Sequence, residues 1–186
     1  MNPEFRIKQW LADDAKRMQA LWLAASCQLP DWCLAAGFVR NLAWDRLHGY
    51  ATPTPLHDLD LIYFCTIDAS EQRDRQLEQQ LIARTGLPWS VKNQARMHRR
   101  NHDAAYVSTA DAMSYWVETE TAVGASLNAK GEIMVIAPFG LQPLFDLTIT
   151  LNPKREKPQD FQQRISAKNW LEIWPKLKVQ YCVGTE

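Results

Sequence analysis

The sequence lacks an excess of charge of either sign. Its 186 residues contain 21 Lys and Arg against 21 Asp and Glu, so the formal net charge is zero. A protein that binds nucleic acid or an anionic membrane through its overall field carries a clear positive excess. Any binding of such a partner must therefore come from a local group of basic residues.

Long hydrophobic runs are also missing. A membrane-spanning helix needs about 18 to 20 consecutive apolar residues, and no segment reaches that length. The N-terminal stretch MNPEFRIKQWLADD lacks the basic and then apolar layout of a signal peptide. These absences predict a cytoplasmic protein without a membrane partner.

Paired cysteine motifs are absent as well. The four cysteines, at positions 27, 33, 65 and 182, form no CxxC pair, which favours reduced structural thiols over zinc ligands or disulfides. His98 and His102 have the spacing of helical zinc ligands, but the surrounding sequence offers no companion ligands. The chemistry must therefore be carried by other residue types.

Apolar periodicity predicts helices that alternate with strands. Helices are expected at residues 13 to 26, 38 to 49, 68 to 84, 108 to 116 and 160 to 174, and strands at 32 to 36, 56 to 64, 89 to 98, 122 to 139 as a hairpin, and 144 to 151. Asp68 with Glu71, and Asp160 with Gln163, are expected as capping boxes. The pattern indicates one α+β (α/β-like) domain over residues 1 to 186, with a central mixed sheet flanked by helices and a C-terminal helical segment at about 158 to 180.

The stretch LHDLDLIYF, residues 56 to 64, places two carboxylates in an apolar strand. Because side chains alternate along a strand, Asp58 and Asp60 project from one face, and Leu59, Leu61 and Tyr63 from the other. Charges are not buried without compensation. Two carboxylates roughly 7 Å apart suit hard divalent cations, Mg²⁺ or Mn²⁺.

A glycine turn precedes this strand. The apolar run WCLAA leads into Gly37, and helical periodicity resumes directly afterwards. The backbone N–H groups at a helix N-terminus favour anions, and a glycine there lets a phosphate approach closely. Arg40, in the first helical turn, would add a forked contact to a phosphate oxygen. Together with cations that bridge phosphates, these parts indicate nucleotidyl transfer.

The stretch LAAGFVRNLAWDRLHGYATPTPLHDLDLIYF, residues 34 to 64, resembles the head-domain signature of the DNA polymerase β-like nucleotidyltransferase superfamily. In particular, it is similar to the phosphate-binding turn and the aspartate-x-aspartate strand of CCA-adding enzymes and bacterial poly(A) polymerases. Together with WSVKNQARMH, it also resembles small bacterial nucleotidyltransferase-like proteins of unassigned substrate. The resemblance implies the nucleotidyltransferase fold.

The resemblance also implies roles for individual residues. Asp58 and Asp60 would be the catalytic residues and would hold two Mg²⁺ ions. An acceptor hydroxyl would attack the α-phosphate of an NTP, such as ATP, and release pyrophosphate. The residues expected at the nucleotide and its phosphates are Gly37, Phe38, Arg40, Asn41, Lys92, Asn93 and Arg96. On residue pattern alone, Lys92 and Arg96 either line the phosphate site or belong to a solvated strand face.

The chain departs from the family pattern in its phosphate turn. Ala36 stands at the first glycine of the usual pair, and Asn41 stands at the aspartate that follows the arginine. The first change is expected to tighten the turn, and the second removes a charge from the start of the helix. Neither change abolishes the expected site.

A third carboxylate of the superfamily is not evident. Its position falls at Ser90 or Asn93, neither of which ionises as an acid, and Asp146 and Glu118 are the possible substitutes. Two hypotheses therefore stay open. The protein is an active nucleotidyltransferase, or it is a catalytically degenerate nucleotide-binding or interaction module of the same fold.

The acceptor is not specified by the sequence. The chain lacks the arginine-rich nucleotide-selecting segments and the long helical neck and tail of CCA-adding enzymes, so tRNA is not the expected acceptor. A small molecule or a protein is favoured, and RNA remains possible. The basic segment RMHRRNH, residues 96 to 102, would bind RNA or form a solvated loop. Trp89 would pack in the core or stack on a nucleobase.

Overall fold

A mixed five-stranded sheet forms the centre of the molecule. The computed structural model describes residues 2 to 181, and its sheet has the order β3-β2-β1-β4-β5. The strands are β1 (Cys33–Ala35), β2 (Leu59–Tyr63), β3 (Trp89–Asn93), β4 (Gly124–Leu127) and β5 (Ile133–Ile136). Strand β2 runs parallel to β3, whereas β1 is antiparallel to both β2 and β4, and β4 is antiparallel to β5. The predicted mixed sheet and the hairpin at its edge are confirmed.

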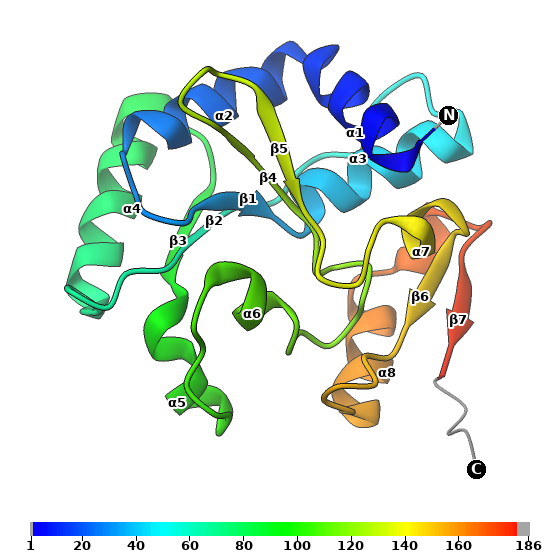
Figure 1. Cartoon of the computed structure of the whole chain (residues 1–186). Coiled ribbons are helices and arrows are strands. Elements are labelled where there is room, and N and C mark those ends of the chain that lie inside the picture. The colour runs from blue at the N-terminus through cyan, green and yellow to red at the C-terminus, as the bar shows by residue number, and fades with distance from the viewer. Residues whose placement is uncertain (1, 182–186) are drawn as a thin grey trace.

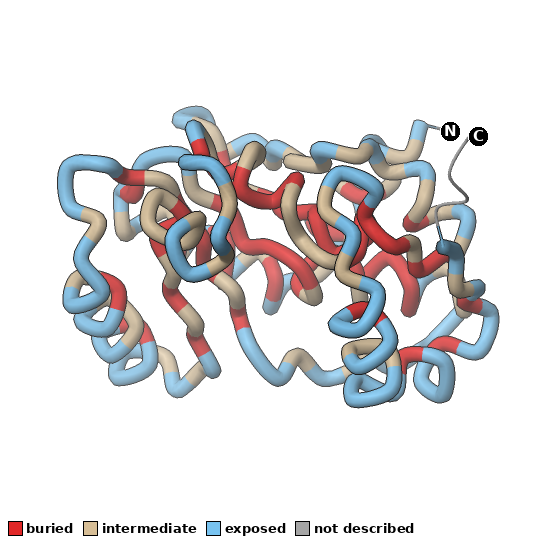
Figure 2. The backbone as a smooth tube through the Cα atoms, turned by 90° about the horizontal axis from the view of Figure 1, so that it is seen from below, coloured by how far each residue is buried: buried red, intermediate tan, exposed pale blue. Residues whose placement is uncertain are grey.

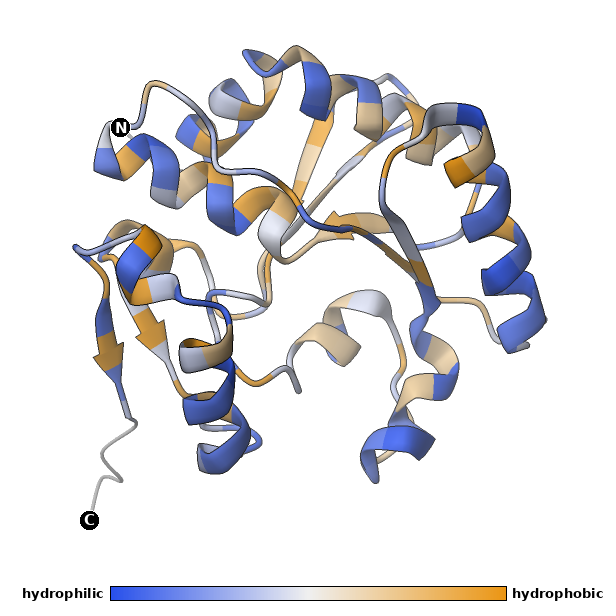
Figure 3. Cartoon of the chain, turned by 180° about the vertical axis from the view of Figure 1, so that it is seen from behind, coloured by the Kyte–Doolittle hydropathy of each residue, from blue (hydrophilic) through white to orange (hydrophobic). Residues whose placement is uncertain are grey.

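Helices cover one face of this sheet (Figure 1). They are α1 (Pro3–Ala12), α2 (Ala15–Ser26) and α3 (Gly37–His48), while α4 (Glu71–Thr85) packs against the edge strand β3. The main apolar core lies between these helices and the sheet, and includes Leu21, Leu42, Leu61 and Val91. In Figure 2 the buried part of the chain is concentrated in the centre of the molecule, and in Figure 3 most of the central strands are coloured as hydrophobic.

The other face of the sheet carries the shorter elements. A small apolar cluster that contains Cys33, Ile62 and Met113 covers part of it. Figure 1 shows two groups of helices below the sheet, with α5 and α6 on one side and α8 on the other. Their bounds are Met97–Asn101 for α5, Thr109–Met113 for α6 and Pro158–Ala167 for α8.

The C-terminal part adds a second, two-stranded sheet. The helix α7 (Gln142–Phe145) leads into β6 (Thr148–Thr150), which pairs in parallel with β7 (Lys178–Gln180). The helices α8 and α9 (Trp170–Ile173) lie between these two strands in the chain. The segment expected to be helical at about 158 to 180 therefore contains two helices and ends in a strand.

Several predicted element boundaries are wrong. The strand expected at residues 89 to 98 ends at Asn93 and continues as the 3-10 helix η1 (Gln94–Arg96) and then α5, and the strand expected at 144 to 151 begins as α7. Helix α1 was not predicted. The N-cap of α4 is Ser70 rather than Asp68, and α8 begins at Pro158, before Asp160. The helix expected at 160 to 174 is interrupted at Asn169, whose φ is 51°.

Two predictions concern features that the sequence lacks, namely membrane-spanning helices and paired cysteines. None of the helices between residues 2 and 181 has the length and hydropathy needed to cross a bilayer. Cys27, Cys33 and Cys65 are free thiols, as the sequence indicated. Cys182 lies outside the described residues.

Candidate functional site

The paired aspartates lie at the start of β2, an internal strand of the sheet. Asp58 is exposed just before the strand, and Asp60 is partly buried within it. Leu59 and Leu61 point into the main core, so the alternation predicted from the sequence is confirmed. In the parallel pairing of β2 with β3, Asp60 stands opposite Ser90. Strand β2 is hydrogen-bonded to a neighbour on each edge, which holds Asp60 in a fixed position.

The carboxyl group of Asp60 is in an unfavourable position for a negative charge. Burial, and to a smaller extent the nearby charge of Asp58, raise its pKa from 3.8 to about 6. A hydrogen bond from Ser90 and the positive charges of Arg40 and Lys168 act in the opposite direction without cancelling the shift. A cation bound between the two aspartates would remove this penalty, because it would neutralise both charges.

Asp60 opens into a cleft of about 600 Å³. The cleft is bordered by Ala36 between β1 and α3, by β2 and β3, by α5, by the segment at residues 115 to 121 and by α8. Its lining has more basic than acidic side chains: Lys92, Arg100, Arg155, Lys157 and Arg164 against Asp60, Glu118 and Asp160. An aspartate beside a cation-rich wall is the arrangement needed to hold a metal ion and the phosphates that it bridges.

The turn before α3 contains a strained residue. Ala36 is the N-cap of α3 and has φ 55° and ψ −120°, a conformation that glycine adopts far more readily than alanine. Its side chain makes no capping hydrogen bond, and Ala36 lines the cleft. The sequence predicts that alanine at this position tightens the turn. In the structure, residue 36 has a backbone conformation in which a methyl group is costly.

Gly37 itself does not need glycine for its backbone. Its φ is not positive, and an added Cβ would lie 3.4 Å from Asn41 Oδ1 and 3.6 Å from Arg40 Nη2, which is ordinary contact. Without a side chain, the backbone at the start of α3 lies close to these two polar groups. Gly37 itself is not part of the cleft lining, whereas its neighbour Ala36 is.

Arg40 is more deeply buried than the predicted phosphate contact requires. It is 7% exposed, and its guanidinium donates from Nη1 to Thr121 Oγ1 at 2.7 Å and from Nη2 to Asn41 Oδ1 at 3.0 Å. It also lies over the ring of Trp170, 4.5 Å from the centroid. Burial lowers its pKa to about 10, although Glu118, Asp60 and Asp58 oppose the shift. Arg40 therefore provides positive charge behind the cleft wall, and its Nε has no hydrogen-bond partner.

The possible substitutes for a third carboxylate are placed very differently. Asp146 is exposed at the end of α7, accepts a hydrogen bond from Gln142 and is not part of the cleft lining. Glu118 lines the cleft, is 1% exposed and is held by Arg164 through two hydrogen bonds of 2.6 and 3.2 Å. Of the two acids, only Glu118 shares a cavity with Asp60.

Three other residues expected at the nucleotide point elsewhere. Phe38 is buried in the main core. Asn93 is also buried, and its side-chain amide donates to the carbonyls of Cys65 and Asp68 while its oxygen accepts from the backbone N–H groups of Cys65 and Ala95. Arg96 forms an ion pair with buried Asp74 and does not line the cleft. The prediction that Lys92 and Arg96 share one strand face is wrong, because the strand ends at Asn93.

The alternative roles of Trp89 and the histidines are limited by their positions. Trp89 is buried and its indole N–H donates to Thr85 Oγ1 at 2.9 Å, so its core interpretation holds. His98 packs against Tyr106, and His102 is exposed.

No group of three or more His, Cys, Asp or Glu side chains suitable for a metal ion is found within residues 2 to 181. Aspartate oxygens are of the ligand type that Mg²⁺ and Ca²⁺ prefer, so Asp58 and Asp60 have suitable chemistry for a divalent cation.

A buried contact that the sequence did not predict anchors the loop before Asp58. The carboxylate of Asp45, on α3, accepts hydrogen bonds from the backbone N–H and the hydroxyl of Thr54 at 2.9 and 3.1 Å. Its other oxygen accepts the indole N–H of Trp174 at 2.8 Å. The loop that delivers Asp58 is thus tied to the C-terminal part of the chain. Neither residue pattern nor spacing signals a pair 129 positions apart.

Comparisons with known proteins give the family and the fold. The profile of a nucleotidyltransferase family matches residues 23–179. The NMR structure of a protein described as revealing a CCA-adding enzyme head domain is 32% identical, with a TM-score of 0.82 and 94% of each chain covered. No curated protein matches the sequence.

More distant structures share the fold. A CCA-adding enzyme in complex with CTP is 15% identical, with a TM-score of 0.62, over 94% of this chain and 43% of the enzyme. A tRNA-processing enzyme complex is 19% identical, with a TM-score of 0.54, over 86% of this chain and 42% of that chain. The protein thus spans less than half the length of either enzyme. The match to residues 23–179 and the 32% identity to a head domain together show that this chain belongs to the nucleotidyltransferase family.

Proposed function

We propose that the protein is a metal-dependent nucleotidyltransferase that moves a nucleoside monophosphate from an NTP to a hydroxyl group. The observation that carries the proposal is the position of Asp60, a carboxylate with a pKa raised to about 6 that lines a cation-rich cleft next to Asp58. A carboxylate kept at such a cost is typical of a functional site. We also propose that the whole chain acts as one domain, since its core includes residues from Ile7 to Leu177.

Different residues would bind the metal ion and the phosphates. Asp58 and Asp60 would hold Mg²⁺ or Mn²⁺, and phosphate oxygens would approach the N–H groups that begin α3 at Gly37. Lys92 and Arg164 line the cleft, and Arg40 adds positive charge behind it. A bound metal ion supplies charge neutralisation at the phosphates and lowers the pKa of an oxygen ligand.

The chemical step is a substitution at phosphorus. The acceptor oxygen forms a bond to the α-phosphorus, the bond from that phosphorus to the bridging oxygen of the β-phosphate breaks, and pyrophosphate leaves with the electron pair. The hydroxyl proton passes to a base. Glu118 lines the same cleft, but Arg164 occupies both of its carboxylate oxygens, so the base is either Glu118 after release from Arg164, an aspartate or a water molecule.

A nucleotide-binding module without turnover is the second candidate. It is favoured by the absence, within residues 2 to 181, of a cluster of three acids able to hold a metal ion. It also agrees with the burial of Arg40, whose guanidinium is already bonded to Thr121 and Asn41. This candidate predicts nucleotide binding without pyrophosphate release for any hydroxyl acceptor.

Calorimetric titration tests the proposal without knowledge of the acceptor. Each of the four ribonucleoside triphosphates is titrated into the protein with and without Mg²⁺. We expect Mg²⁺-dependent binding of at least one NTP, and we expect Asp58→Ala to weaken it by at least about tenfold, since even outer-shell changes at metal sites cost that much.

The matched control is Asp13→Ala, which removes an exposed carboxylate outside the cleft and should leave the affinity unchanged. Absence of binding at millimolar NTP, or equal binding by wild type and Asp58→Ala, contradicts the proposal.

A further inference from the structure

A second cavity of about 410 Å³ adjoins the cleft. Its lining shares Lys92, Met97 and Arg100 with the lining of the cleft, so the two cavities meet along these side chains. It is lined by four basic residues and one acidic residue, together with small and apolar ones: Lys92, Arg96, Arg99, Arg100, Glu71, Ala69, Ala95 and Met97. We call this cavity the basic pocket.

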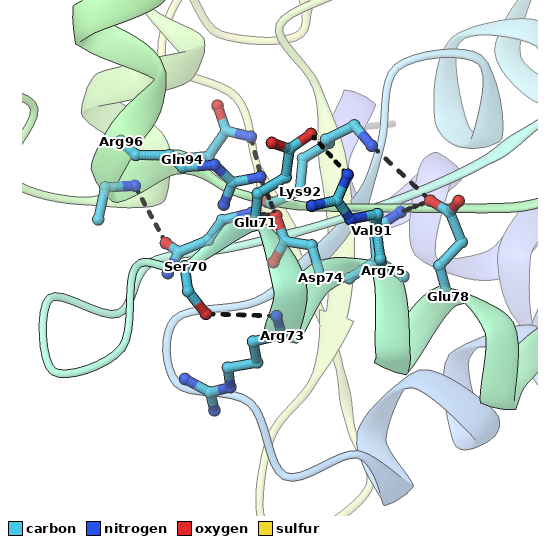
Figure 4. Close-up of polar contacts among 12 residues, drawn as sticks. Ser70, Glu71, Arg73, Asp74, Arg75, Glu78, Val91, Lys92, Gln94 and Arg96 are labelled. Carbon is cyan, nitrogen blue, oxygen red and sulfur yellow. Dashed lines mark hydrogen bonds and ion pairs between the residues drawn. The ribbon is translucent and has the colours of Figure 1, made fainter.

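The acidic residues of α4 are already engaged beside the basic pocket (Figure 4). Asp74 is 1% exposed and accepts hydrogen bonds from the Tyr63 hydroxyl and the Asn93 backbone, besides its ion pair with Arg96. Glu78 accepts from the Val91 backbone N–H at 2.9 Å and lies 3.7 Å from Lys92 Nζ. Glu71 faces Arg75 at 3.9 Å. Asp74 and Glu78 thus pair with Arg96 and Lys92, whereas Arg99 and Arg100 are left without a counter-charge.

Positive charge therefore accumulates on the open side of the basic pocket. Within the described part of the chain, the side chains of Arg99 and Arg100 have neither an ion pair nor a hydrogen bond, and both residues are exposed on α5. Arg96 Nη1 is buried without a hydrogen-bond partner. Two free guanidinium groups next to an unpaired donor indicate a site for an anion with several acceptor oxygens.

The distance to the proposed reaction centre suits one substrate that reaches both sites. Lys92 follows Ser90 by two residues on the same face of β3, and Ser90 stands opposite Asp60. Same-face neighbours along a strand are roughly 7 Å apart and paired strands roughly 5 Å apart. A molecule of a few bonds in length can therefore place an anionic group in the basic pocket and a hydroxyl near Asp60.

We propose that the basic pocket binds a phosphate group of the acceptor, so that the acceptor is a phosphate-bearing hydroxyl compound. This inference rests on the proposed nucleotidyl transfer at Asp58 and Asp60. The phosphate would accept from Arg99, Arg100 and Lys92, while the hydroxyl would point toward the α-phosphate of the NTP. The same chemistry is presented by a small phosphomonoester and by the phosphates of an oligonucleotide.

The test uses the full chain with Asp58→Ala and EDTA, which removes metal-dependent binding of phosphates. Inorganic phosphate is titrated at constant ionic strength while backbone amide shifts are followed by ¹⁵N NMR. We expect saturable shifts at residues 95 to 100 and a loss of affinity of at least about tenfold in Arg99→Gln/Arg100→Gln, because charge-assisted hydrogen bonds are removed. Arg84→Gln, an exposed charge near the end of α4, is the matched control and should bind phosphate normally.

Two further probes separate the sources of the phosphate. Glycerol 3-phosphate and an eight-nucleotide oligouridylate are titrated into the same variants. If both lose affinity in Arg99→Gln/Arg100→Gln, the tighter ligand identifies the source, and the proposal holds for either. No saturable binding of phosphate, or equal affinity in the double variant, overturns it whatever the NTP titration shows. Melting curves of each variant verify folding, since both arginines are exposed.

Discussion

Asp60 is a single residue whose charge opposes the stability of the fold. Its pKa of about 6 lies above its ordinary value of 3.8, so the folded protein binds a proton more tightly than the unfolded chain does. Between these two values, the folded state therefore holds more protons, and the free energy of unfolding falls as the pH rises. At neutral pH the metal-free protein carries the full penalty.

Replacing this carboxylate should stabilise the protein. We expect Asp60→Asn to raise the free energy of unfolding at pH 7.5 by about 2 kcal/mol, because it removes a charge that burial and Asp58 disfavour. At pH 4 the difference should nearly disappear. Urea denaturation in EDTA at both pH values measures it. A variant that is less stable than wild type at pH 7.5 would show that Asp60 has a structural role.

A substitution at Gly37 should reduce nucleotide binding without reducing stability. We expect Gly37→Ala to leave the free energy of unfolding unchanged or raise it by up to about 1 kcal/mol, since alanine favours helix and its Cβ meets only ordinary contacts. Mg²⁺-dependent NTP affinity should fall at least about tenfold, because the methyl group would displace a phosphate oxygen from its charge-assisted hydrogen bonds. Chemical denaturation and calorimetry report the two quantities.

Ala36→Gly is the counterpart in the same turn. Because Ala36 has φ 55°, removing its methyl group should raise the free energy of unfolding by about 1 kcal/mol, after the entropy of the more flexible unfolded chain is subtracted. Unchanged NTP affinity in Gly37→Ala would indicate that this glycine serves neither the turn nor a ligand.

At the level of elements, local patterns predicted what local forces determine. The alternation of LHDLDLIYF placed Asp60 on the open face of β2, and Gly131, with φ 79°, marked the turn between β4 and β5. The end of β3 was missed although Asn93 provides a local signal, because its side chain accepts from the Ala95 N–H at 3.0 Å and caps η1. The same side chain also bonds to backbone groups of Cys65 and Asp68, 28 and 25 residues away, which no local pattern predicts.

The starts of two helices were predicted imprecisely, because more than one residue near each start can begin the helix. Ser70, directly before α4, accepts from the Arg73 N–H at 3.3 Å, whereas Asp68 accepts from the Ser70 N–H at 3.0 Å and shapes the preceding turn. Both residues are good caps, and the sequence does not rank them. In α8, Pro158 begins the helix two residues ahead of Asp160, as proline commonly does in a first turn.

At the level of the whole molecule, the site depends on contacts between distant segments. Arg40 bonds to Thr121, 81 positions away, and Arg164 bonds to Glu118, 46 positions away. The sequence predicts Asp58, Asp60 and Gly37 as site residues because they share a short window with a recognisable pattern. It did not identify Thr121 or Arg164, because no periodicity relates a helix near the C-terminus to a loop in the middle of the chain.

The contact of Trp174 with Asp45 leads to a prediction on this scale. We expect Trp174→Phe to lower the free energy of unfolding by about 1 to 2 kcal/mol, because it leaves a buried carboxylate oxygen without its donor. It should also weaken Mg²⁺-dependent NTP binding, since Asp45 holds Thr54 in the loop before Asp58. Denaturation and calorimetric titration of the same preparation measure both effects.

Trp22→Phe is the matched control for that substitution. Trp22 lies on α2, is 54% exposed and has no part in the cleft lining, so neither stability nor affinity should change appreciably. A loss of stability in Trp174→Phe with unaltered NTP affinity would show that the loop keeps its position without the tryptophan.

The carboxylate of the cleft and the free cations of the basic pocket lie on different kinds of structure. Asp60 lies on a strand with a neighbour on each edge, whereas Arg99 and Arg100 lie on α5, a helix of five residues without a buried side chain. Backbone amides of β2 should exchange with solvent deuterium only when the sheet opens, and those of α5 should exchange through local fraying. Such a difference in exchange would mean that the basic pocket can adjust to acceptors of different shape while Asp60 keeps its position in the sheet.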